Sequence, residues 1–119
     1  MKNIALFILL LALIAGCANG KGNKGPDESI PACVREQTSE FDKQPNANTP
    51  IQVDEYLYMG KQVFLFTADC CDQFNMLYDE NCKSLCAPSG GYTGGGDGKC
   101  KDFKDSAKLV RMIWKKEKK

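Results

Sequence analysis

Hydrophobic residues recur along the chain with two different periods, and the first of these predicts a short helix. In the stretch SIPACVREQTSEFDKQP, residues 29–45, Cys33, Val34 and Phe41 recur at spacings close to 3.6 residues. Pro31 suits the first turn of such a helix, and another proline follows its expected end. The pattern therefore predicts one amphipathic helix that buries this apolar face and leaves its acidic side chains in water.

Two apolar runs in the middle of the chain predict a β-hairpin. Residues 53–59 and 62–68 are rich in aromatic and β-branched side chains, and Gly60-Lys61 supplies the turn between them. The second run contains four consecutive apolar residues at 63–66. Such a run is typical of a central strand that is buried on both faces.

Three further stretches complete the predicted fold. Residues 75–88, NMLYDENCKSLCAP, predict a second short helix, and residues 89–99, SGGYTGGGDGK, predict a long surface loop. Residues 107–115, AKLVRMIWK, predict a strand whose side chains alternate in direction. Together the elements predict an α+β fold, with a three-stranded antiparallel sheet and two short helices in one small disulfide-rich domain.

The N-terminus has a different pattern. Lys2 precedes an apolar run at residues 4–14, which has the length of the core of a secretory signal and is shorter than a membrane-spanning helix. The run leads into Ala15, Gly16 and Cys17, and small residues before a cysteine resemble the lipobox of bacterial lipoproteins. That resemblance implies cleavage before Cys17 and its acylation with fatty acids such as palmitate.

The lipobox-like motif predicts where the protein is located and how the chain is divided into segments. The alternative interpretation is an ordinary signal peptide, or a short membrane anchor, with an incidental cysteine. As a lipoprotein, the molecule is expected in the bacterial cell envelope, held by its lipid on the extracytoplasmic side of a membrane. The expected segments are a signal peptide at 1–16, a flexible tether at 17–29, a globular domain at 30–115 and a basic tail at 116–119.

Six cysteines remain after Cys17, and export predicts that they form three disulfides, because about 90 residues give only a small core. A zinc site is disfavoured, since the sequence has no histidine and does not contain two closely spaced cysteine pairs. A redox site is disfavoured because no Cys-x-x-Cys motif occurs. The predicted disulfide cysteines are Cys33, Cys70, Cys71, Cys82, Cys86 and Cys100.

The charge distribution is uneven. Residues 27–98 contain 4 basic and 12 acidic residues, whereas residues 99–119 contain 9 basic and 3 acidic residues. The basic segment could attract anionic lipid or nucleic acid, but we expect it to lie beside the acidic body. Export also makes nucleic acid an unsuitable partner.

The chemistry-bearing residues predict no enzyme. The glycine-rich stretch is not a phosphate loop, because Cys100 follows Lys99 where Ser or Thr is required. We therefore expect no catalytic, cofactor-binding or metal-binding residues. The leading prediction is a noncatalytic binding or structural module with an unidentified envelope protein as partner. Exposed aromatic residues are the remaining candidates for a binding patch: Tyr56, Tyr58, Phe74 and Tyr92.

Two resemblances bear on this prediction. The segments CCDQ, LYDENC and GDGKC, within residues 31–115, resemble a family of small uncharacterised bacterial lipoproteins carried as a domain of unknown function. The later cysteines, with Tyr78 between Cys71 and Cys82, resemble the second half of Kazal-type protease inhibitor domains. The Kazal resemblance makes protease inhibition the alternative function, and it implies the disulfide pairs Cys33–Cys86, Cys70–Cys82 and Cys71–Cys100.

The chain departs from the Kazal pattern in its first cysteines. Cys33 lies far upstream, with the predicted hairpin inserted after it, and Cys70 directly precedes Cys71. In Kazal inhibitors the segment between the second and third cysteines enters the protease, and here that segment has no residues. We therefore expect the scaffold to be kept and inhibition to be lost.

Overall fold

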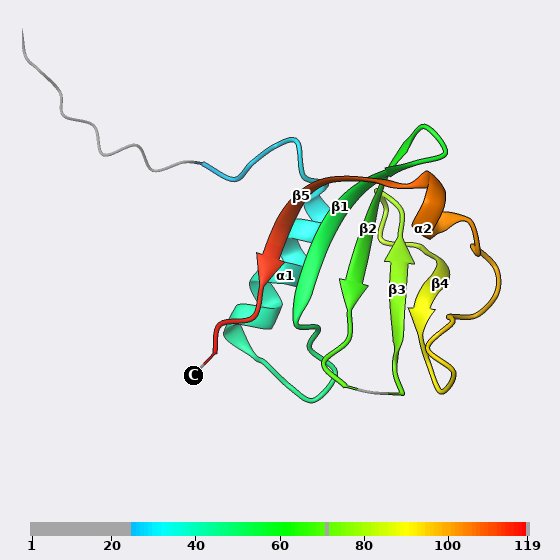
Figure 1. Cartoon of the computed structure of the whole chain (residues 1–119). Coiled ribbons are helices and arrows are strands. Elements are labelled where there is room, and N and C mark those ends of the chain that lie inside the picture. Colours follow the sequence, from blue (N-terminus) through cyan, green and yellow to red (C-terminus); the bar gives the residue numbers. More distant parts are fainter. Residues whose placement is uncertain (1–24, 71, 119) are drawn as a thin grey trace, which may run out of the picture.

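The computed structural model describes residues 25–70 and 72–118 (Figure 1), so the predicted signal peptide, Cys17 and Cys71 lie outside the described residues. The described chain forms a five-stranded antiparallel sheet with the strand order β4-β3-β2-β1-β5. The strands are β1 Gln52–Tyr58, β2 Lys61–Thr67, β3 Phe74–Tyr78, β4 Ser84–Gly90 and β5 Lys108–Lys115. The helices are α1 Ala32–Lys43 and α2 Phe103–Ser106.

The predicted α+β fold with a three-stranded sheet is wrong, because the domain is mostly β. The stretch 75–88, predicted as a helix, forms the β3–β4 hairpin. Its turn is held by Asp79, whose Oδ1 accepts hydrogen bonds of 2.9 Å from the backbone N–H groups of both Asn81 and Lys83. An aspartate that bonds the backbone just ahead of it favours a turn over a continuing helix.

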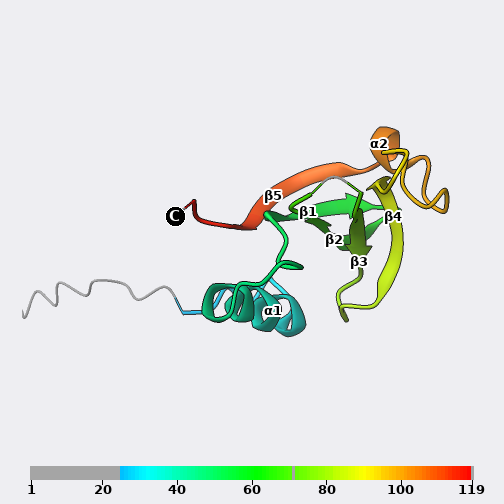
Figure 2. The ribbon, with the colours of Figure 1, turned by 90° about the horizontal axis from the view of Figure 1, so that it is seen from below.

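The helix predicted near the N-terminus is confirmed as α1, which lies against one face of the sheet (Figure 2). Val34 is fully buried there in a cluster with Val53, Phe64 and Phe66. The Phe41 ring extends this contact and lies 6.1 Å from Phe66 and 5.3 Å from Trp114. Burial of these large apolar side chains is the main attachment of the helix to the sheet.

The opposite face of the sheet carries a second cluster, formed by Tyr58, Val63, Leu77, Cys86, Cys100 and Phe103. The α2 helix supplies Phe103, whose ring lies 5.2 Å from that of Tyr58. The Tyr58 hydroxyl donates a hydrogen bond of 2.6 Å to Asp102. Val63 and Phe64 belong to different clusters, so the prediction that this strand is central and buried on both faces is confirmed.

The predicted hairpin is confirmed as β1 and β2, with a turn one residue earlier than expected. Tyr58 pairs with Lys61, so the turn residues are Met59 and Gly60 instead of Gly60 and Lys61. Both have positive φ, at 51° and 73°, as a two-residue turn with the twist of the strands requires. Met59 adopts this backbone without being glycine, which a propensity argument does not anticipate.

The predicted C-terminal strand is confirmed as β5, but it is an edge strand with two irregularities. Its register against β1 shifts between Val53 and Asp54 and again between Glu55 and Tyr56. Val110 and Ile113 are the β5 residues without a partner in this register. Such bulges increase the local twist of an edge strand.

Candidate functional site

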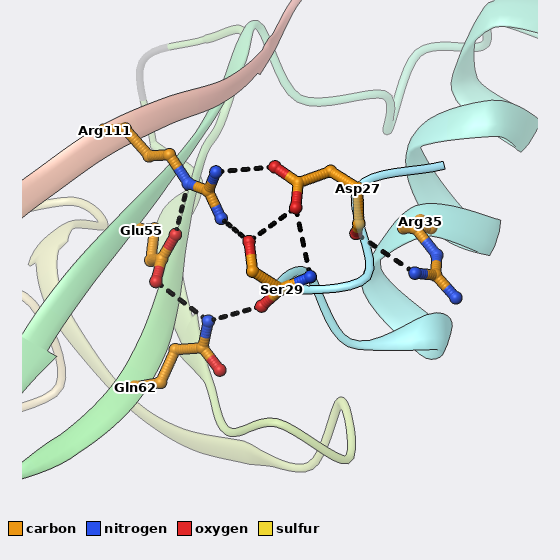
Figure 3. Close-up of polar contacts among 6 residues, drawn as sticks. All are labelled: Asp27, Ser29, Arg35, Glu55, Gln62 and Arg111. Carbon is orange, nitrogen blue, oxygen red and sulfur yellow. Dashed lines mark hydrogen bonds and ion pairs between the residues drawn. The ribbon is translucent and has the colours of Figure 1, made fainter. Parts of the chain in front are cut away.

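A polar cluster joins the start of the described chain to the middle of β5. We call it the Arg111 cluster and define it as Asp27, Ser29, Glu55, Gln62 and Arg111 (Figure 3). The Arg111 guanidinium donates to Glu55 through Nε at 2.7 Å, to Asp27 at 2.6 Å and to the Ser29 hydroxyl at 2.5 Å. One side chain of the sheet thus holds two residues of the predicted tether.

Two further side chains complete this attachment. Gln62 on β2 donates to Glu55 at 2.8 Å and to the Ser29 carbonyl at 3.0 Å. From the helix, Arg35 donates to the Asp27 carbonyl at 3.1 Å. The chain therefore enters the domain at a point that β1, β2, β5 and α1 hold together. Asp27 and Ser29, at the end of the predicted tether, are thus hydrogen-bonded to the domain.

The electrostatics of the cluster follow from these bonds. Hydrogen bonds from the hydroxyl and backbone N–H of Ser29, together with Arg111, lower the pKa of Asp27. The acceptors Glu55 and Asp27 in turn raise the pKa of Arg111. Glu55 is buried, with 7% of the residue exposed, whereas Arg111 remains half-buried. The cluster is thus a charged contact with one buried partner.

An open groove lies at the C-terminal end of β5. It has a volume of about 880 Å³, and Phe41, Ile51 and Trp114 are among its lining residues. The Trp114 indole donates a hydrogen bond of 2.9 Å to Asp42. At the rim, Lys116 forms an ion pair of 2.8 Å with Asp69. The lysines of the groove therefore lie among acidic side chains, and the groove is not a uniformly basic surface.

Two basic residues of the C-terminal segment make ion pairs with the rest of the domain. Each ion pair found within residues 25–70 and 72–118 joins Arg111 or Lys116 to an acidic residue of the body. The expectation that the basic segment lies beside the acidic body is confirmed for these two residues.

The disulfides connect the elements in a way that the sequence did not indicate. Cys33 on α1 bonds to Cys82 in the β3–β4 turn, and Cys86 on β4 bonds to Cys100. Cys70 is also disulfide-bonded. The general prediction of disulfides is confirmed by the first two bonds. The specific pairs Cys33–Cys86, Cys70–Cys82 and Cys71–Cys100 are wrong, because Cys82 and Cys100 have other partners.

These bonds also remove the basis of the Kazal resemblance. Its tyrosine is expected to begin a central helix, whereas Tyr78 ends strand β3. The matching cysteines Cys82 and Cys86 flank the start of a second strand and bond to different elements. The cysteine spacing therefore matches the Kazal pattern, but the central helix that a Kazal domain has at this position is replaced here by two strands.

Residues 89–99, called the glycine loop below, begin with the last two residues of β4 and then fold back against that strand. The bond Cys86–Cys100 closes the loop, and the Asp97 N–H donates to the Ala87 carbonyl at 2.9 Å. A Cβ atom at Gly96 would lie 2.0 Å from that carbonyl oxygen. The expected surface turn is found at residues 91–99, whereas Ser89 and Gly90 belong to β4, and Gly91 and Gly96 are closely packed. At its tip, Tyr92 is 92% exposed.

Two of the other aromatic candidates pack within the domain, and the third is partly exposed. Tyr58 is buried and bonded to Asp102, and Tyr56 packs 5.0 Å from the Phe103 ring. Burial, and then the charge of Asp54, raise the pKa of Tyr56. Phe74 is 46% exposed, and its ring fills the place that a Cβ at Gly91 would occupy. Of the four predicted candidates, Phe74 and Tyr92 remain available at the surface.

Two negative observations apply to residues 25–70 and 72–118 only. Among them, no three or more His, Cys, Asp or Glu side chains are arranged to hold a metal ion. Neither described helix has the length and apolar character needed to cross a membrane.

One comparison with known proteins gives a match. A family model described as Domain of unknown function (DUF6970) matches residues 39–116. The chain belongs to this family. The match runs from the end of α1 through β5, so it includes Glu55, Gln62 and Arg111, while Asp27 and Ser29 lie before it. No curated protein and no solved structure gives a significant match.

Proposed function

We propose that the chain is a lipid-anchored protein of the bacterial cell envelope that acts as a noncatalytic binding module. Cys17 after Ala15 and Gly16 supports the lipid attachment. The bonds Cys33–Cys82 and Cys86–Cys100 support an oxidising compartment on the extracytoplasmic side, where structural disulfides persist.

The observation that carries this proposal is the separation of the entry point from the glycine loop. Residues 25–31 and the C-terminus lie on one side of the domain, whereas β4, the glycine loop and α2 lie on the other (Figures 1 and 2). The Arg111 cluster fixes the entry point on the sheet and helix. In a protein anchored at Cys17, the glycine loop then points away from the membrane.

The glycine loop has the properties of a recognition surface. The disulfide Cys86–Cys100 and the close packing of Gly91 and Gly96 support the loop, and Tyr92 projects from it into solvent. A tyrosine offers a large contact area with few rotatable bonds, and a rigid support reduces the entropy lost on binding. Tyr92 and the neighbouring Phe74 are therefore the residues that we assign to contact with a partner.

Lipid attachment is tested by growing a bacterial strain that expresses the chain with a labelled fatty acid. The wild-type protein should incorporate the label and partition into the detergent phase, and Cys17→Ala should lose both properties. Unlabelled wild-type protein in the aqueous phase would contradict the anchor.

The assigned contact is tested in the same strain with a photo-crosslinking amino acid. Placed at Tyr92, it should give a discrete crosslinked product. Placed at Glu40, an exposed position on α1, it should not. Equal products from both positions would contradict the assignment of the loop, whatever the outcome of the labelling.

A further inference from the structure

The sheet ends at β4 and β5, and within the described residues only the β4 edge is covered. The Asp97 N–H bonds to the Ala87 carbonyl, the Gly90 N–H bonds to the Gly94 carbonyl, and Pro88 has no N–H to offer. The strand β5 pairs with β1 on one side. No backbone hydrogen bond joins its outer side to residues 25–70 or 72–118.

The open edge carries apolar side chains in solvent. Leu109, Val110 and Met112 are 61%, 54% and 54% exposed. Protein edge strands are usually protected by charges, prolines or covering loops, because free N–H and C=O groups pair readily with another strand. At β4 the chain uses two of these protections. At β5 three large apolar residues occupy the middle of the strand instead.

The charges of β5 are arranged around these apolar residues. Lys108 and Lys115 stand at the two ends of the strand, and both are exposed. Neither forms an ion pair with the described part of the chain. In contrast, the charge of Arg111 is balanced by Glu55 and Asp27. The edge therefore presents an apolar centre between two uncompensated positive charges.

We infer that β5 binds an extended segment of a partner protein, apolar in its centre and acidic at both ends, as an added antiparallel strand. Backbone hydrogen bonds would supply the pairing, and the side chains would select the segment by apolar contact and charge. Every strand pair in this sheet is antiparallel, which favours the same direction for an added strand. The bulges at Val110 and Ile113 favour a short segment.

The charges also disfavour the fully overlapping pairing of β5 with β5 of a second copy of the same chain. In a symmetric antiparallel pair of β5 strands, centred between Arg111 and Met112, Lys108 of each copy lies opposite Lys115 of the other. Like charges directly opposite each other destabilise strand pairing. A partner segment with an acidic residue at each end would instead place opposite charges beside Lys108 and Lys115.

The test is a titration of the ¹⁵N-labelled full-length protein, in detergent micelles, with the peptide acetyl-ETVTVTVE-amide. Amide shifts should change within residues 108–115, and their hydrogen exchange should slow. The same peptide with alternate N-methylated amides should not bind, because it lacks the donors. The peptide with lysines in place of both glutamates should bind about tenfold more weakly.

Two variants localise the effect. Met112→Lys places a charge in the apolar centre and should abolish binding, while Leu85→Lys makes the same change at a 42% exposed position on β4 and should not. Both changes are at exposed positions, and circular dichroism checks that both variants fold.

The inference is overturned by no shift changes at about 1 mM peptide, by changes centred on the groove or the glycine loop, or by equal binding of the lysine peptide. Concentration-dependent shifts of β5 without peptide would identify a second copy as the occupant and would also overturn it. None of these outcomes depends on acylation of Cys17.

Discussion

At the scale of single residues, the Arg111 cluster depends on a buried carboxylate. Glu55 is 7% exposed and accepts hydrogen bonds from Arg111 and Gln62. A buried charge is tolerated when an opposite charge and donors compensate the lost water. Arg111 therefore stabilises the fold mainly by keeping Glu55 compensated, and secondarily by its contacts with Asp27 and Ser29.

Replacement of Arg111 by methionine should lower the free energy of unfolding by about 1–3 kcal/mol. The loss arises because Glu55 stays buried and keeps only the bond from Gln62. Urea denaturation of the oxidised protein measures it. Lys115→Met is the matched control on the same strand and should change stability by less than about 0.5 kcal/mol. Equal stability of the two variants would show that the cluster contributes nothing.

The pKa of Asp27 gives a second, pH-dependent test of the same cluster. Its main cause of lowering is the Ser29 hydroxyl, followed by the Ser29 backbone N–H, with smaller contributions from Arg111. Ser29→Ala should therefore raise the pKa of Asp27 more than Arg111→Met does, as measured by NMR titration of the carboxyl carbon. Because the folded pKa lies below the unfolded value, this contribution to stability is present above about pH 4 and is lost as the pH falls through the folded pKa. The reverse order of the two variants would contradict the assigned causes.

At the scale of elements, the glycine loop depends on close approach of its backbone to β4. Gly96 and Gly94 have similar φ values of 75° and 77°, but a Cβ at Gly96 would overlap the Ala87 carbonyl, whereas one at Gly94 has open space. Gly94→Ala should cost about 1–2 kcal/mol for its positive φ alone. Gly96→Ala should cost clearly more and should separate the loop from β4. Thermal unfolding compares the two variants, and equal midpoints would mean that the loop is not packed as described.

The elements also show which parts of this fold were accessible from sequence. The α1 helix, the β1–β2 hairpin and β5 each have a single clear hydrophobic period, and all three were predicted. The β3–β4 hairpin was not, because Tyr78, Cys82 and Cys86 recur at helical spacing. The competing signal was the turn-forming Asp79, and the pairing partners that select strands lie elsewhere in the chain.

The candidate sites were accessible only in part. The exposed Tyr92 was identified, but the Arg111 cluster was not, because Asp27 and Arg111 are 84 residues apart and neither belongs to a motif. One signal was present: Glu55 and Arg111 are charged residues in the interior of predicted strands, and a charged side chain needs a partner when it is buried. The groove beside Trp114 depends on the placement of α1, which no local pattern specifies.

At the scale of the whole molecule, the disulfides Cys33–Cys82 and Cys86–Cys100 hold different parts of the domain. The bond Cys33–Cys82 joins α1 to the β3–β4 turn across 49 residues, whereas Cys86–Cys100 closes a segment of 14 residues on the opposite face. In the chain-entropy description, closing the longer segment restricts the unfolded chain more. The first bond is also the only covalent link between the described helix α1 and the described strands other than the main chain itself.

The two disulfides should therefore differ in how much stability is lost on their removal and in which part of the domain is affected. Cys33→Ala with Cys82→Ala should lower the free energy of unfolding by about 4 kcal/mol, and Cys86→Ala with Cys100→Ala by about 3 kcal/mol. Trp114, the only tryptophan, contacts Phe41 of α1 and reports on the helix. Its fluorescence should shift to the red in the first pair, because a loosened helix exposes the indole, and should stay unchanged in the second. A red shift only in the variant without Cys86–Cys100 would mean that α1 is held from the face of the sheet that carries the glycine loop. That result would contradict the contacts of Val34 and Phe41 with the other face.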